Sequence, residues 1–425
     1  MKSQESFDLL ITNASQLITL KGNKVPRRTK YMSELGIIKN GAIAVTADKI
    51  HWVGPTKQLP QLWLKNTENV IDASGSVVMP GFVDPHTHLV FGGSREKEFA
   101  LRASGATYSE IAKSGGGILS TVRATRKASF NSLVESSIVK LDRMIELGTT
   151  AVEIKSGYAL NLEDELKILK TIKELVSRHP ISIVSTFLGA HICPPERDKK
   201  SYIDFLKTVM IPQVASQQLA EFCDVFCEDW VFTKDESFDI LKTGLKYGLL
   251  PKIHTEQFHS TDGYKVAIEL NAVSADHLDY LSDQGINDLA SSNVIGCLLP
   301  GASFFLGSKK YPPARKMIDA GIAVALSTDF NPGSSMTQSM PLMMTIACTH
   351  MGMTPAETIV ASTINAACAI KKETKIGSLE QGKQADFIII DANDYRVLPY
   401  HFGVNLVKTV IKNGKIVFPK DISIR

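Results

Sequence analysis

Apolar stretches of strand length alternate with amphipathic stretches of helical length between residues 77 and 375. The apolar stretches span residues 77–84, 150–154, 181–188, 225–227, 251–254, 272–275, 294–299 and 323–327. Helical periodicity separates them, as in residues 162–177 and in residues 311–320, which Gly321 follows at a helix-stop position. Eight such pairs are typical of a (β/α)8 barrel. We therefore predict an α/β fold with a TIM-like barrel over residues 77–375.

The two ends of the chain share a different pattern, in which short strand-like runs are separated by turn signals. Such runs occupy residues 8–12, 42–45, 49–54 and 70–72 before the barrel, and residues 386–390, 407–411 and 415–417 after it. The pair Asn413-Gly414 is a strong hairpin signal between the last two runs. Both ends are therefore predicted to contain short strands rather than further β/α pairs.

Composition excludes several classes of protein. The chain has 425 residues, 44% of them hydrophobic, and a net charge of +3, which is typical of a globular protein with a large core. The chain has no basic run interleaved with aromatic residues, so nothing in it suggests nucleic-acid binding. No apolar run is long enough for a membrane span or a signal peptide. Six scattered cysteines form no C-x-x-C pair, so we expect reduced thiols in the cytoplasm.

Side chains that can bind a metal follow the apolar strands where each strand ends. The first strand runs into His86 and His88, which share one face of an extended backbone. His254 ends the fifth strand, and Asp329 follows the eighth. Because barrel active sites lie at the carboxyl ends of the strands, we expect these four side chains to meet. Three imidazoles and one carboxylate suit Zn²⁺ or Fe²⁺ and leave a position for water, so we predict one metal ion.

Two of these strand ends also suggest acid–base chemistry. Asp329 could accept the proton of a metal-activated water, and His277, at the end of the sixth strand, could stabilise an oxyanion or relay a proton. A single strand histidine is usually a core or surface residue, so the prediction depends on the joint pattern. Lys155 ends the second strand and could bridge two metals if carbamylated, but no acidic set for a second ion is evident.

Longer motifs narrow the interpretation. The runs at residues 80–88 and 377–386 resemble the entry to and exit from the barrel in the amidohydrolase superfamily. Within that superfamily, further runs resemble the imidazolonepropionase family over nearly the whole chain, namely residues 105–108, 114–118, 153–158, 187–191 and 327–333. The runs Lys155-Ser156-Gly157-Tyr158 and Asp329-Phe330-Asn331-Pro332-Gly333 are the most specific.

The resemblance implies both a reaction and an assembly. The expected reaction is hydrolysis of 4-imidazolone-5-propanoate to N-formimidoyl-L-glutamate in histidine degradation. The expected enzyme is a cytoplasmic homodimer with one divalent or trivalent ion per subunit, zinc or iron, and with no nucleic-acid or membrane partner. Residues 1–76 and 376–425 should form a composite β-sandwich domain beside the barrel of residues 77–375.

The resemblance also assigns roles to individual residues. The metal positions of the family match His86, His88, His254 and Asp329, and its catalytic histidine matches His277. The substrate-binding positions match Arg95, Tyr158, His191, Asn331, Gly333 and Ser334. We expect Arg95 to bind the substrate carboxylate by paired hydrogen bonds.

Gln257 departs from part of the family, in which glutamate occupies this position. Glutamine cannot exchange a proton, so we expect Gln257 to orient the ring amide while His277 or Asp329 supplies the proton. The adjacent Glu256 should point the other way on an extended strand. Two other interpretations stay open: a nucleobase or aminoimidazole deaminase, which Gln257 disfavours, and a non-catalytic barrel, which should have lost metal ligands.

Overall fold

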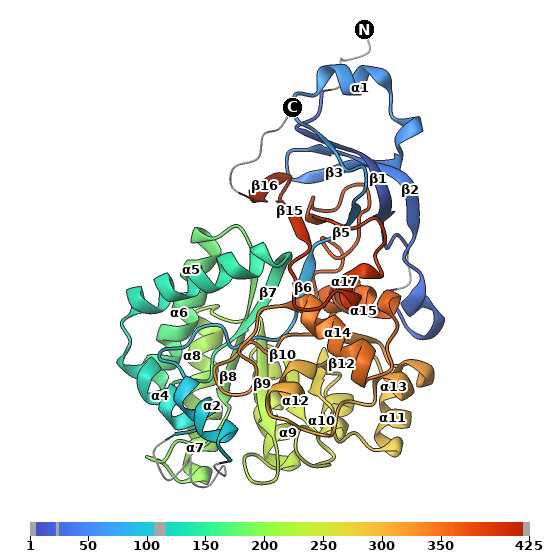
Figure 1. Cartoon of the computed structure of the whole chain (residues 1–425). Helices are drawn as coiled ribbons and strands as arrows, with labels where there is room; N and C mark the ends of the chain where they lie inside the picture. Colours follow the sequence, from blue (N-terminus) through green and yellow to red (C-terminus); the bar gives the residue numbers. More distant parts are fainter. Residues whose placement is uncertain (1–5, 23–24, 106–115, 420–425) are drawn as a thin grey trace.

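Two eight-stranded sheets organise the chain. The structure is a computed structural model that describes residues 6–22, 25–105 and 116–419. One sheet forms a parallel inner ring covered by helices, and the other, built from both ends of the chain, lies on one side of that ring (Figure 1). The predicted α/β fold, a TIM-like barrel with a small second β domain, is therefore confirmed.

The barrel strands pair in chain order, and each predicted apolar stretch overlaps one of them. They are β6 (Phe82–Asp84), β7 (Thr149–Lys155), β8 (Ser182–Ala190), β9 (Phe222–Cys227), β10 (Leu250–Thr255), β11 (Ser274–His277), β12 (Ile295–Leu298) and β13 (Val324–Leu326). All seven pairings between successive strands are parallel. Their carboxyl ends consequently face one side of the ring.

Helices connect these strands and cover the outside of the ring (Figure 1). The helices before β10 are α2 (Glu96–Ala103), α4 (Ile118–Lys127), α5 (Phe130–Glu146), α6 (Leu162–Arg178), α7 (Lys199–Phe205), α8 (Ile211–Ser216) and α9 (Lys234–Lys246), with a π turn at Leu206–Met210. Those after it are α10 (Gly263–Glu269), α11 (Asp283–Ala290), α12 (Pro300–Phe305), α13 (Ala314–Ala320), α14 (Met340–His350), α15 (Pro355–Ala361) and α16 (Ile364–Ala369).

Local sequence explains where the predicted helices start and stop. The Asn161 side chain accepts a hydrogen bond from the Asp164 amide and caps α6, whose first turn is acidic as the helix dipole favours. Helix α13 ends at Gly321, which adopts a φ of +96° that glycine tolerates best. Among the described helices, none has the length and hydropathy of a membrane span.

Asp84 joins the first and last strands of the barrel. Its carboxylate accepts hydrogen bonds from the Ser327 hydroxyl, from the Thr328 amide at 3.1 Å and from the Thr328 hydroxyl at 2.5 Å. The His88 amide donates to the Phe330 carbonyl at 3.0 Å just beyond this junction. These bonds bring the chain that follows β6 against the chain that follows β13.

Apolar residues close the opposite end of the ring. Side chains near the starts of the strands, including Val83, Ala151 and Ala323, form one buried cluster with the alanines of α16. Burial of this apolar surface stabilises the barrel at roughly 25 cal/mol per Å². This end of the barrel is therefore closed by apolar packing.

The terminal sheet has the strand order β16-β15-β14-β5-β1-β2-β3, with β4 paired to β1. Its members are β1 (Leu9–Ile18), β2 (Ile37–Thr46), β3 (Lys49–Pro55), β4 (Val70–Asp72), β5 (Val77–Pro80), β14 (Phe387–Ile390), β15 (Val407–Lys412) and β16 (Lys415–Phe418). Short helices α1 (Gln61–Asn66) and α17 (Val397–Tyr400) and 3-10 turns at Thr29–Ser33 and Thr56–Gln58 accompany it.

The predicted strand over residues 77–84 is divided between the two sheets. Strand β5 pairs with β1 and β14 in the terminal sheet, whereas β6 pairs with β7 in the barrel. Gly81 stands between them, where a Cβ atom would collide with the Thr150 side chain. The expectation of one continuous strand is therefore wrong, because the two halves find different partners.

Candidate active site

Four side chains predicted to bind a metal converge at the carboxyl ends of the barrel strands. His88 Nε2 lies 3.5 Å from His254 Nε2, and Asp329 Oδ1 lies 3.5 Å from both His86 Nε2 and His88 Nε2. Two ligands held at about 2.1 Å from one tetrahedral ion would be separated by roughly 3.4 Å. The spacing of these atoms is therefore that of a mononuclear site.

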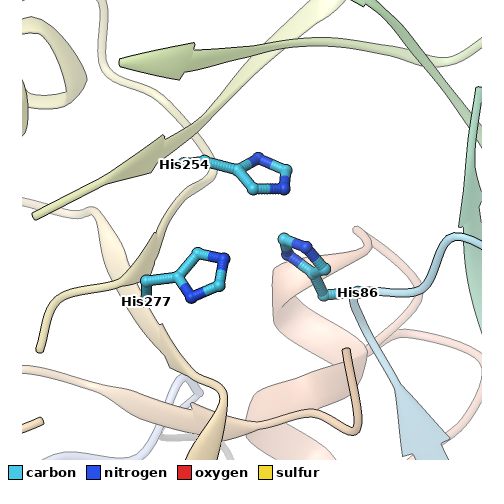
Figure 2. A group of neighbouring side chains, drawn as sticks. All are labelled: His86, His254 and His277. Carbon is cyan, nitrogen blue, oxygen red and sulfur yellow. The ribbon is translucent and has the colours of Figure 1, made fainter. Parts of the chain in front are cut away.

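His277 belongs to the same cluster. Ring nitrogens of His86, His254 and His277 lie within 4.8 Å of one another, and Figure 2 shows the three rings approaching from different segments of the chain. His86, His88 and Asp329 form a second such group. The fold thus brings the predicted metal ligands and the predicted catalytic histidine together.

The protonation of these histidines suits a cation. Burial lowers the pKa of His86, His88 and His277 well below the ordinary value, and nearby positive groups lower it further. The rings are therefore neutral at neutral pH, which is the form that binds metals. His86 Nε2 is buried without a hydrogen-bond partner, so this donor set fits a metal ion.

Carboxylates inside the barrel face the far sides of two of these rings. His86 Nδ1 lies 2.6 Å from Asp276 Oδ2. His254 Nδ1 lies 3.0 Å from Asp224 Oδ2, although the contact is not aligned as a hydrogen bond. Contacts of this kind orient metal-binding histidines so that Nε2 faces the ion.

The backbone is strained at two residues of the site. His277 has a φ of +79° and Asp329 a φ of +52°, a region that side-chain-bearing residues seldom adopt. Asn331 supports the second of these, since its Nδ2 donates to the Asp329 carbonyl at 2.7 Å. Its Oδ1 accepts from the amides of Gly333 and Ser334, each at 2.8 Å. Asn331 therefore fixes the loop that presents the aspartate.

A cavity of about 500 Å³ opens above this cluster. All the predicted site residues except His86 line it, namely His88, Arg95, Tyr158, His191, His254, Gln257, His277, Asp329, Asn331, Gly333 and Ser334. His86 is completely buried beneath it. Predicted metal-binding and substrate-binding residues thus share one cavity large enough for a small molecule.

Arg95 is held at the rim of this cavity by Glu98. The Glu98 Oε2 atom accepts from Arg95 Nε at 2.9 Å and lies 2.7 Å from Nη2. Its Oε1 accepts from the Ser120 hydroxyl at 3.0 Å. A Cβ atom at Gly333 would collide with Arg95 Nη1, so glycine makes room for the guanidinium. Sequence analysis did not identify Glu98, although its i,i+3 spacing from Arg95 was a usable signal.

Tyr158 and His191 form one wall of the cavity. The His191 ring stacks on His88 with centroids 5.1 Å apart, and its Nδ1 lies 3.0 Å from the Gly157 carbonyl. Burial, with the neighbouring His254, lowers the pKa of His191 to about 3. Burial also raises the pKa of Tyr158, which therefore stays a phenol and can donate a hydrogen bond.

Glu256 and Gln257 point in different directions, but not by strand alternation as expected, because β10 ends at Thr255 and Glu256 has a φ of +56°. Glu256 accepts hydrogen bonds from the amides of Thr261 at 3.2 Å and Gly263 at 3.1 Å. Gln257 lines the cavity, and its own amide donates to Glu228 Oε1 at 3.0 Å. Glu228 was not identified from the sequence as the residue that anchors this backbone.

Lys155, two interior aspartates and one sequence motif complete the comparison between the sequence interpretation and the structure. Lys155 contacts Glu153 and Asp224 at 2.8 and 2.7 Å, which leaves its amine engaged in ion pairs. Asp224 and Asp276 were not singled out, although acidic residues within apolar strands were a signal for an interior role. Of the motif at residues 105–108 and 114–118, residues 106–108 and 114–115 lie outside the described residues.

Comparison with known proteins identifies the family. Two models, each described as "Amidohydrolase family", match residues 69–147 and 234–417. A protein named imidazolonepropionase from Geobacillus sp. (strain WCH70) is 50% identical over 414 residues, which cover 96% of this chain and 97% of the relative. The chain belongs to the imidazolonepropionase family.

Other relatives agree with this assignment. An imidazolonepropionase from Alkaliphilus metalliredigens (strain QYMF) is 46% identical over 415 residues, covering 97% of this chain and 98% of that protein. An adenosine deaminase from Xanthomonas campestris, solved with bound zinc, has a TM-score of 0.69 at 18% identity and covers 97% of this chain and 93% of its own. That structure supports the barrel fold. The motif resemblance to the amidohydrolase superfamily and its imidazolonepropionase family is confirmed.

Proposed function

We propose that this chain hydrolyses the ring amide of 4-imidazolone-5-propanoate and releases N-formimidoyl-L-glutamate, a step of histidine degradation. One observation carries the proposal: a single cavity joins a cluster of buried histidines and an aspartate to an arginine at its rim. The substrate is a small anion with a cyclic amide, so it needs both features. Near-full-length similarity to proteins named imidazolonepropionase supports the same reaction.

The proposed ligands of the metal are His86, His88, His254 and Asp329. We propose one divalent or trivalent ion, zinc or iron, since three imidazoles and a carboxylate suit either metal. When bound, such an ion supplies a Lewis acid that activates water near neutral pH.

Two residues of the chain would manage protons and charge. Water adds to the ring carbonyl carbon, the carbon–nitrogen bond breaks, and the departing nitrogen takes a proton. Asp329 accepts the proton of the water and passes it to that nitrogen, while the Ser334 hydroxyl, 3.4 Å from Asp329 Oδ2, orients the carboxylate. His277, neutral in its buried position, donates a hydrogen bond to the oxyanion. Gln257 orients the ring amide.

The outer cavity would bind the rest of the substrate. Arg95 pairs with the propanoate carboxylate, and charge-assisted hydrogen bonds of this kind are among the strongest in proteins. Tyr158 donates a hydrogen bond to the ring, whereas His191, whose Nδ1 proton is directed to the Gly157 carbonyl, accepts one at Nε2. Asn331, Gly333 and Ser334 line the same cavity, and Gly333 leaves space for the guanidinium.

Arg95→Ala should raise KM about ten- to a hundred-fold and leave kcat nearly unchanged, because the guanidinium binds a group remote from the reacting bond. Steady-state kinetics measure both constants. Arg102→Ala is the matched control, since Arg102 also lines the cavity but stacks on the Phe305 ring, 5.1 Å from its centroid. An unaltered KM in Arg95→Ala would exclude the carboxylate role.

The proposed reaction can be tested with purified protein and 4-imidazolone-5-propanoate. We expect the imidazolone absorbance to fall as N-formimidoyl-L-glutamate accumulates in equal amount, with no ammonia released. Ammonia release without ring opening would instead indicate a deaminase on this scaffold. Absence of turnover in protein that carries its metal would reject the proposal.

Three expectations about organisation remain proposals. They are a homodimer, a cytoplasmic location, and a division into one domain of residues 77–375 and one composite domain of residues 1–76 and 376–425. These bounds place β5 (Val77–Pro80) in the domain of residues 77–375, although the strand pairs with β1 and β14 of the terminal sheet.

A further inference from the structure

A cluster of five charged side chains lies inside the barrel beneath the proposed metal ligands. Each of the five is completely buried. The members of this inner charge cluster are Glu153 and Lys155 on β7, Asp224 on β9, Lys252 on β10 and Asp276 on β11. Removing charged groups from water costs free energy unless they are paired, so such a cluster inside a barrel requires a structural or functional explanation.

Lys155 stands at the centre of this cluster. Its Nζ lies 2.7 Å from Asp224 Oδ2, 2.8 Å from Glu153 Oε1 and 3.7 Å from Asp276 Oδ2. Lys252 is bound differently, since its Nζ donates to the Pro85 carbonyl at 2.9 Å and lies 3.9 Å or more from the carboxylates. Lys155 is therefore the closer cation to all three acids.

The oxygen that Lys155 contacts is the oxygen that faces a proposed metal ligand. Asp224 Oδ2 lies between Lys155 Nζ, at 2.7 Å, and His254 Nδ1, at 3.0 Å. The other oxygen of Asp224 accepts the Val225 amide at 2.7 Å, so the carboxylate is held at both ends. Lys155, Asp224 and His254 thus form a line of contacts that ends at the metal position.

An ionised acid at Asp224 would determine which ring nitrogen of His254 faces the metal. The surroundings of Asp224 suit a carboxylate, since its Oδ2 faces the Lys155 ammonium at 2.7 Å and its Oδ1 accepts the Val225 amide. An ionised carboxylate only accepts hydrogen bonds, so it favours a proton on Nδ1 of His254 and a free lone pair on Nε2.

We propose that Lys155 is a positioning residue that acts through Asp224 to hold His254 in its metal-binding orientation. This inference rests on the metal site of the proposed function. In this role Lys155 is an ion-paired ammonium beneath the site. It is not carbamylated and does not bridge two metals.

The test measures zinc affinity, with the full-length apoprotein and a chromogenic chelator as competitor. The variants are Lys155→Met, Asp224→Asn and the double variant. We expect each single variant to weaken Zn²⁺ binding about ten- to a hundred-fold, as for other residues that support a metal ligand. The double variant should bind Zn²⁺ about as weakly as Asp224→Asn, because both changes remove the same support.

A matched control distinguishes positioning from general destabilisation. Lys412 is also a fully buried lysine, paired with Asp386 at 2.6 Å, but it lies in the terminal sheet. Lys412→Met should leave Zn²⁺ affinity within about two-fold of the unmodified chain. In the apoproteins, NMR of the ring nitrogens should show the Nδ1–H form of His254 and its loss in Asp224→Asn.

Several outcomes would overturn the inference. Zinc affinity of Lys155→Met within about two-fold of the unmodified chain would do so, as would fully additive losses in the double variant. Should Lys155→Met fail to fold, Asp224→Asn and the double variant, which removes one charge of each sign, provide the test. Unchanged zinc affinity in Asp224→Asn would then overturn the inference. An unmodified chain that binds no zinc would reject the proposed site itself, whereas unaffected variants of a zinc-binding chain reject only the role of Lys155.

Discussion

His254→Ala is expected to lose turnover and bound metal together, with kcat/KM reduced by roughly a thousand-fold or more. The ring of His254 is buried, and its Nε2 lies 3.5 Å from His88 Nε2 in the cluster of proposed ligands. Its removal leaves two histidines and Asp329, a set that binds a cation more weakly. Steady-state kinetics and elemental analysis of the same preparation measure both losses.

His401→Ala provides the control for this experiment. His401 is exposed in the loop that follows α17, and it does not line the cavity. It should keep full activity and metal content. A His254→Ala protein that turns over substrate while free of metal would contradict the proposed site.

His277→Ala is expected to lower kcat by about 10²- to 10⁴-fold while the protein keeps its metal and KM changes little. The reason is that the proposed hydrogen bond from His277 strengthens only as the oxyanion forms. Elemental analysis is essential here, because the ring nitrogens of His277 lie close enough to those of His86 and His254 to bind the same ion.

Asparagine at the same position separates the two roles of His277. His277→Asn retains an N–H donor, so it should recover part of the activity lost in His277→Ala. Loss of metal from both variants would instead make His277 a ligand. Equal activity in the alanine variant and the unmodified chain would remove it from the reaction.

The barrel could be predicted from sequence because its signals are local. Each strand and helix has its own period, and caps such as Asn161 and Gly321 act within a few residues. The division at Gly81 could not be predicted, since it depends on the pairing of β5 with β14, which lies some 300 residues later in the chain. Periodicity alone does not report such distant partners.

The candidate site could be predicted in part for a related reason. Strand ends of a barrel face one side, so His86, His254 and Asp329 were expected to meet once the fold was expected. The contacts of Lys155 and Asp224 were not accessible in this way. They depend on which interior residues of neighbouring strands lie at the same height, and that follows from the strand register.

Elemental analysis of the active, purified protein tests the central claim most directly, namely that side chains from distant strands hold one catalytic ion. Activity should rise in proportion to bound zinc or iron across partly depleted samples and reach its maximum at one ion per chain. Full activity on 4-imidazolone-5-propanoate in samples that contain no metal would contradict the claim.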